Sequence, residues 1–250
     1  MENRNQFFAN NNDEQVISSS RSFVSGVFAW MFLALLISSV AAYLFATNAE
    51  LMGYLSTYTP KGVRPTGLGY IVMFAPLGLV MLLSFGINKL SFSSMSVIYL
   101  IYALVTGISL SFILLTYTGE SVVKTFGVTA LMFGSMAALG YTTKMDLTRF
   151  GSILYMCLIG IIIAMLVNFF MHSSGLSYII DIAGVLIFTG LTAYDMQKIK
   201  NMGEGLSTAE ESTKKMMLMG ALNLYLDFIN MFLFLLRLFG DQIGRASCRE

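Results

Sequence analysis

Seven stretches of the chain are long and apolar enough to cross a lipid bilayer, and this feature limits the possible folds more than any other. A transmembrane helix needs roughly 20 apolar residues. The windows lie at Phe23–Thr47, Gly69–Ile87, Ser96–Tyr117, Thr125–Tyr141, Gly151–His172, Tyr178–Met196 and Met216–Phe239. Only 12% of the residues are charged, against about 25% in an ordinary soluble domain. The sequence therefore predicts an all-α polytopic membrane protein with seven spans within residues 23–240.

Polar segments flank this domain. Residues 1–22 are rich in Asn, Gln and Ser and predict a disordered N-terminal tail without the apolar core of a cleavable signal. Residues 241–250 form a C-terminal tail, of which 243–250 (IGRASCRE) match one reading frame of a common sequencing adapter. Our hypothesis is that these last residues are a cloning or sequencing artefact.

The basic residues of the connectors predict the orientation in the membrane. Nine Lys and Arg residues fall on the side of the N-terminus and six on the other side, or four without Arg245 and Arg249. Cytoplasmic loops carry the excess of basic residues. The N-terminus is therefore expected in the cytoplasm and the C-terminus outside.

Composition and motifs argue against several classes of function. The net charge is +1 and the basic residues are dispersed, so nucleic acid is not an expected partner. One histidine and two cysteines do not make a metal-ligand set, and no resident cofactor is expected. The chain lacks G-x-S-x-G and H-E-x-x-H motifs. A two-aspartate membrane protease would need a G-x-G-D motif, but Asp227 lies in YLDF. We expect a protein that is not an enzyme.

Two aspartates lie inside the last two spans. Asp195 is part of TGLTAYDMQKIK and Asp227 is part of LNLYLDFINMFLFLLRLFG. A carboxylate in a span costs on the order of 2.5 to 3.5 kcal/mol, so such residues face a bundle interior, a cavity or a partner. If the two meet, they cannot both ionise cheaply and will share a proton, which would make a proton-sensitive latch. Asp181, at the outer end of the sixth span, is expected to be a solvated helix cap.

Whether the pair meets depends on the connector between the two spans. On ideal helices, Asp195 and Asp227 come within about 6 Å of the same height if the last helix begins near Lys215. We therefore predict that Ser207–Lys214 forms a separate surface turn or short helix.

Three further residues are candidates for the same site. Asn223 and Asn230 share a helix face with Asp227. They are either part of an ion path or interhelical hydrogen-bonding groups, and we favour the second interpretation. Lys89, at the end of the second span, could reach inward to neutralise a carboxylate or could extend outward to the interface. Small residues at Gly134, Ala138, Gly190 and Ala193 predict close contacts between helices.

The two aspartate motifs together resemble the closing signature of the Bax inhibitor-1 family, whose bacterial branch includes YccA-like inner-membrane proteins. Weaker agreement lies at TGISLSFIL and KMDLTRFGSIL. The resemblance implies a seven-helix bundle with the last helix central. It also implies a pH-dependent Ca²⁺ leak in which Asp195 and Asp227 form the gate and the proton sensor.

Two functional hypotheses follow from this resemblance. In the first, the protein is a cation leak channel, and the two carboxylates with the Asn223 and Asn230 carbonyl groups hold Ca²⁺ transiently. Related bacterial members pair the gate with an arginine on the second helix, where this chain has Lys89, which lacks the bidentate fork. In the second, the protein regulates a membrane-bound protease, with the polar N-terminal tail as the contact.

Overall fold

The structure is a computed structural model that describes residues 2–59, 62–204 and 210–241 and is mostly helical within them. Its elements are α1 (Glu2–Thr47), α2 (Ala49–Leu55), β1 (Ser56–Thr59), β2 (Gly62–Pro65), α3 (Gly67–Gly86), α4 (Phe92–Leu114), α5 (Gly119–Thr142), α6 (Thr148–Met171), α7 (Ser174–Gly203) and α8 (Glu211–Phe239). In the described part of the chain, seven helices, all except α2, are long and apolar enough to cross a membrane. The predicted all-α polytopic fold with seven spans is confirmed.

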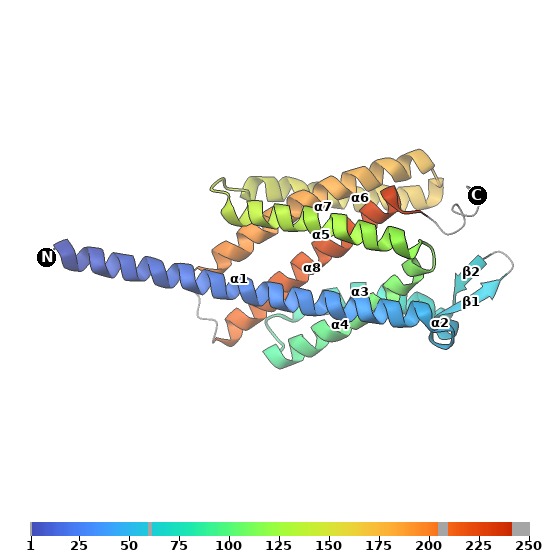
Figure 1. The fold of residues 1–250 in the computed structure, drawn as a ribbon, viewed down its shortest axis with the longest axis horizontal. Coiled ribbons are helices and arrows are strands. Elements are labelled where there is room, and N and C mark those ends of the chain that lie inside the picture. Colours follow the sequence, from blue (N-terminus) through green and yellow to red (C-terminus); the bar gives the residue numbers. More distant parts are fainter. Residues whose placement is uncertain (1, 60–61, 205–209, 242–250) are drawn as a thin grey trace.

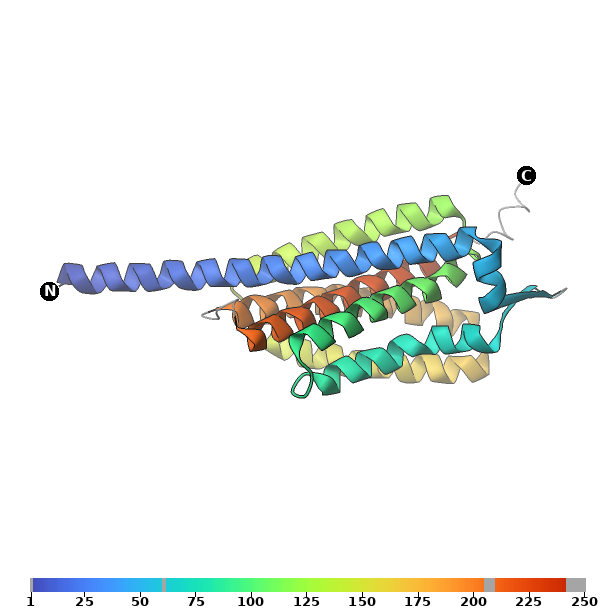
Figure 2. The same cartoon turned by 90° about the horizontal axis from the view of Figure 1, so that it is seen from below.

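Helix α8 lies at the centre of the bundle, as the resemblance implied. It packs against α1, α4, α5 and α7, and Figures 1 and 2 show it, in orange to red, running between them. In its most apolar window 72% of the residues are buried, compared with 6% for α6 and 11% for α3. Helices α3 and α6 therefore form the lipid-facing periphery, and α8 forms the core.

Helix α1 is longer than the sequence predicted. The structure has one continuous helix from Glu2 to Thr47, where a disordered tail was expected over residues 1–22. The apolar span begins only at Ser19, and Figure 1 shows the N-terminal part of α1 extending beyond the other helices. Once a stable helix has formed, each added residue gains a hydrogen bond without a new nucleation cost, so a polar segment can continue it.

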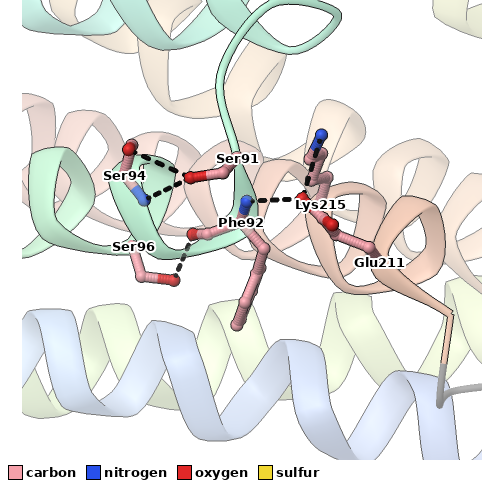
Figure 3. Close-up of polar contacts among 6 residues, drawn as sticks. All are labelled: Ser91, Phe92, Ser94, Ser96, Glu211 and Lys215. Carbon is pink, nitrogen blue, oxygen red and sulfur yellow. Dashed lines mark hydrogen bonds and ion pairs between the residues drawn. The ribbon is translucent and has the colours of Figure 1, made fainter.

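The start of α8 is joined to the start of α4 (Figure 3). The Glu211 carboxylate accepts a hydrogen bond from the Phe92 backbone N–H at 2.9 Å, and Lys215 lies 3.4 Å from the same carboxylate. Ser91 caps α4 by accepting a bond from the Ser94 N–H at 3.3 Å. These contacts place negative charge at the positive end of α4, which favours both helix starts.

The connector before α8 differs from its prediction. Helix α8 is unbroken from Glu211, so residues 211–214 belong to it and do not form a separate element. Residues 207–209 lie outside the described part of the chain. The bond between Glu211 and the start of α4 gives a physical reason for α8 to begin four residues before Lys215.

Glycines allow close contacts between helices at places that only partly match the prediction. Gly140 of α5 lies against the backbone of Ala193 in α7, and Gly190 lies against the Leu154 side chain. Gly134, in contrast, has open space around it and is exposed, as is Ala138. The prediction was therefore wrong for these two residues, because small size alone does not reveal which face of α5 turns inward.

Gly140 and Gly134 offer a matched test of this packing. A methyl group at Gly140 would collide with the Ala193 backbone, so Gly140→Ala should lower the free energy of unfolding by about 1–3 kcal/mol. Gly134→Ala should be neutral or should stabilise the helix by up to about 1 kcal/mol. Thermal unfolding of both variants in detergent measures the difference, and equal effects would contradict the assigned α5–α7 contact.

Candidate functional site

The structure brings Asp195 and Asp227 to the same level of the bundle. Helices α7 and α8 are antiparallel neighbours, with the rings of Phe188 and Phe234 5.8 Å apart and Ile199 packed against Gly220. Asp195 lies seven residues after Phe188, and Asp227 lies seven residues before Phe234. Each aspartate is therefore about 10 Å along its helix from the same pair of rings.

The early start of α8 does not separate the pair. From the Ile199–Gly220 contact, α7 continues four residues to Gly203, whereas α8 extends nine residues back to Glu211. Helix α8 thus reaches about 7 Å beyond the end of α7 at this face of the bundle. The ends of α7 and α8 are therefore not level, whereas the heights expected from the sequence assumed that they are.

Both aspartates line one cavity of about 460 Å³ between α3, α6, α7 and α8. Their side chains are almost enclosed, with Asp195 3% and Asp227 4% exposed. Asn223 and Asn230 also line the cavity, so the four polar residues predicted on α7 and α8 are brought together. The remaining lining is largely apolar: Leu77, Val80, Leu158, Ile162, Met165, Phe188, Leu191, Leu226 and Phe234. Apart from the hydroxyl of Tyr155 on α6, the oxygen atoms of the polar side chains therefore lie on the α7–α8 side of the cavity.

The polar partners of the two carboxylates are unequal. The Tyr155 hydroxyl of α6 donates a hydrogen bond of 3.4 Å to Asp195 Oδ1, which is long for this bond type. Asp227 Oδ2 is buried and has no hydrogen-bond partner among the described residues. Asn230 donates to the Leu226 carbonyl of its own helix at 2.8 Å, which leaves its side-chain oxygen available. One carboxylate is thus held by a donor and the other is not.

Sequence reasoning missed Tyr155. The sequence shows only that Tyr155 is a hydroxyl-bearing residue in an otherwise largely apolar span. Its distance from Asp195 along the chain, 40 residues, hid the contact.

Lys89 does not reach the aspartates. It is exposed in the turn between α3 and α4, where its backbone N–H donates to the Gly86 carbonyl at 2.9 Å. Val80, the last cavity residue of α3, lies six residues before Gly86, or about 9 Å along the helix. In the described part of the chain Lys89 forms no ion pair, which fits the outward-directed alternative.

The far end of α7 and α8 holds a second charged contact that was not expected. Asp181 forms an ion pair of 2.8 Å with Arg237, and the Asp181 side chain is only 11% exposed. The Arg237 guanidinium also lies 4.5 Å from the centre of the Phe234 ring, at the edge of the cavity. The expectation that Asp181 is a solvated cap was wrong, because Arg237 turns back onto the start of α7.

This ion pair should stabilise the α7–α8 contact. Arg237→Gln leaves the largely buried Asp181 carboxylate without its partner and should lower the free energy of unfolding by about 1–3 kcal/mol. The control is Lys124→Gln, which removes an exposed pair with Glu120 in which both side chains are more than 70% exposed and should change stability little. Chemical unfolding in detergent measures both, and equal losses would argue against a structural role for the Asp181–Arg237 pair.

Seven apolar helices, the last of them central, with two enclosed carboxylates on the last two, define an α-helical integral membrane protein. A family model described as inhibitor of apoptosis-promoting Bax1 matches residues 20–244. The chain therefore belongs to the Bax inhibitor-1 family, as the motifs around Asp195 and Asp227 indicated.

Bacterial relatives cover almost the whole chain. The inner membrane protein YbhL of Escherichia coli K12 is 45% identical over 223 residues, which are 89% of this chain and 92% of the relative. An uncharacterized protein of Borreliella burgdorferi is 42% identical over 231 residues, covering 92% of this chain and 96% of its own. An uncharacterized protein of Rickettsia prowazekii, RP147, is 40% identical over 222 residues, covering 89% and 90%. The residues matched by the family model, 20–244, include both aspartate-bearing helices.

Proposed function

We propose that this protein is a pH-sensitive leak channel for Ca²⁺, gated by a proton shared between Asp195 and Asp227. The observation that carries the proposal is that both carboxylates line one cavity and are nearly enclosed, and that none of the described residues lining this cavity is cationic. Two neighbouring carboxylates in such a place cannot both be charged cheaply, so the number of protons they hold depends on pH. The charge of the cavity then changes with pH.

Ca²⁺ is the expected permeant ion because of the donor atoms in the cavity. It prefers carboxylate and carbonyl oxygen and takes about six to eight ligands when bound tightly. Two aspartates with Asn223 and Asn230 supply fewer protein ligands than a tight site needs. Such a set suits an ion that binds briefly and moves on.

The proposed location is the bacterial inner membrane, with the N-terminus in the cytoplasm. The Escherichia coli relative is named an inner membrane protein. The excess of basic residues in the connectors on the N-terminal side supports this orientation.

The gate can be tested by neutralising the pair in proteoliposomes. The double variant Asp195→Asn with Asp227→Asn should remove most of the pH dependence of Ca²⁺ flux between about pH 5 and 8, because neither amide can titrate, whereas each single variant keeps one carboxyl group and should shift the midpoint of the profile. Flux is followed with an entrapped Ca²⁺ indicator after a step in external Ca²⁺.

Asp146→Asn is the matched control. Hydrogen bonds from Thr148, one of them from its backbone N–H at 2.9 Å, hold the pKa of Asp146 below its usual range. Asp146 therefore stays ionised throughout the assay, and its replacement should leave the flux profile as in the wild type. A wild-type profile in the double variant of Asp195 and Asp227 would reject the proposed gate.

A second candidate function, regulation of a membrane-bound protease, is favoured by the projecting N-terminal part of α1 (Figure 1). A helix that extends beyond the bundle offers a surface for a partner without disturbing the cavity. Deleting residues 2–17 should abolish co-purification of the protease while leaving Ca²⁺ flux unchanged. The deletion spares Ser19 and Ser20, whose hydroxyls donate to the Gly203 and Lys200 carbonyls. Protease binding by the shortened protein would exclude this contact.

A further inference from the structure

We propose that Tyr155 is the positioning residue of the aspartate pair: its hydroxyl holds the Asp195 carboxylate, so that Asp227 carries the shared proton. This inference rests on the proposed proton-sharing function and adds a division of roles within the pair. It also assigns to a neutral hydroxyl on α6 the task that the sequence suggested for Lys89.

The placement of Tyr155 is specific. It is the one polar side chain that α6 contributes to the cavity lining, beside Leu158, Ile162 and Met165. Its ring meets the Tyr194 ring edge to face, with centroids 6.1 Å apart. Gly151, one turn earlier on α6, leaves the room that the Tyr194 ring occupies. The two rings together hold the Tyr155 hydroxyl toward α7.

The polar groups around the two carboxylates favour a negative charge on Asp195 more than on Asp227. Asp195 accepts the Tyr155 hydrogen bond and lies within the electrostatic influence of Lys198, one turn further along α7. Asp227 lines the same cavity as Asp195 but has a buried oxygen without a donor among the described residues. An enclosed carboxylate without donors is favoured in its neutral form, whereas a hydroxyl donor favours the charged form. The charge therefore falls to Asp195 and the proton to Asp227.

Other charged groups near the pair do not alter this division. Among the described residues, α3 contributes only Leu77 and Val80 to the cavity, and α1, α4 and α5 contribute none to its lining. Lys200 of α7 is turned toward α5, where it donates to the Tyr141 carbonyl at 2.9 Å and lies 5.2 Å from the centre of that ring. Within the described residues, Tyr155 and Lys198 are thus the groups that favour a charge on Asp195.

A hydroxyl donor has a different consequence from an arginine. It stabilises one negative charge without adding a positive one, so the singly protonated pair keeps a net charge of about −1. A passing cation then meets a negative cavity that contains no competing side-chain cation.

Tyr155→Phe tests the proposal, with Tyr194→Phe as the matched control. Both changes remove one hydroxyl from the same pair of rings, but Tyr194 donates no hydrogen bond to either aspartate in the described structure. Tyr155→Phe should move the midpoint of the pH profile of Ca²⁺ flux upward by about one pH unit, because the charged form loses a donor. Tyr194→Phe should leave the midpoint in place.

Infrared difference spectroscopy of the reconstituted protein gives a readout that does not depend on flux. The C=O stretching band of a protonated carboxylic acid should disappear in Asp227→Asn and remain in Asp195→Asn. Loss of the band in Asp195→Asn alone would overturn the assignment, and so would equal midpoints in Tyr155→Phe and Tyr194→Phe. If instead both aspartate variants keep the wild-type pH profile, the gate itself fails, and this outcome is separate from either result for Tyr155.

Discussion

The arrangement of the bundle depends on the need to keep two carboxylates away from lipid. Asp195 and Asp227 belong to helices that are otherwise apolar enough to span the membrane. An unpaired carboxylate facing acyl chains is costly, so both helices must turn these residues toward protein or a cavity. The structure meets this condition by placing α8 at the centre, with α7 beside it and α3 and α6 as outer walls of the shared cavity.

Different contacts fix the two ends of the packed helices α7 and α8. At the end near Asp181, the ion pair with Arg237 and the tilted contact between the Phe188 and Phe234 rings hold the two helices together. At the opposite end, the Glu211 contact with α4 fixes where α8 begins. The carboxylate pair lies between these two ends, so contacts elsewhere on α7 and α8 set the distance between the two helices at the pair. The pair itself needs no strong salt bridge and can bind or release protons.

The polar contacts of the site come mostly from residues distant in sequence. Tyr155 contacts Asp195 although 40 residues separate them in the chain. Arg237, near the end of α8, contacts Asp181, near the start of α7. A pattern of apolar and polar residues records which face of a helix is polar, but not which neighbouring helix presents a donor to it. Lys89 illustrates the same limit, since its type and position suggested a counter-charge, whereas the end of α3 at Gly86 leaves it exposed.

The sequence by itself determined the seven spans, the family and the two acidic residues of interest, because span length and the cost of a charge in lipid are local properties. Only the tertiary structure decided that α8 reaches beyond α7, that Gly140 but not Gly134 is an interface residue, and that Tyr155 contacts the pair. Those outcomes depend on the tilt, rotation and ends of helices packed against one another. The tilt, rotation and ends of a helix arise from many contacts at once, and no single sequence motif encodes them.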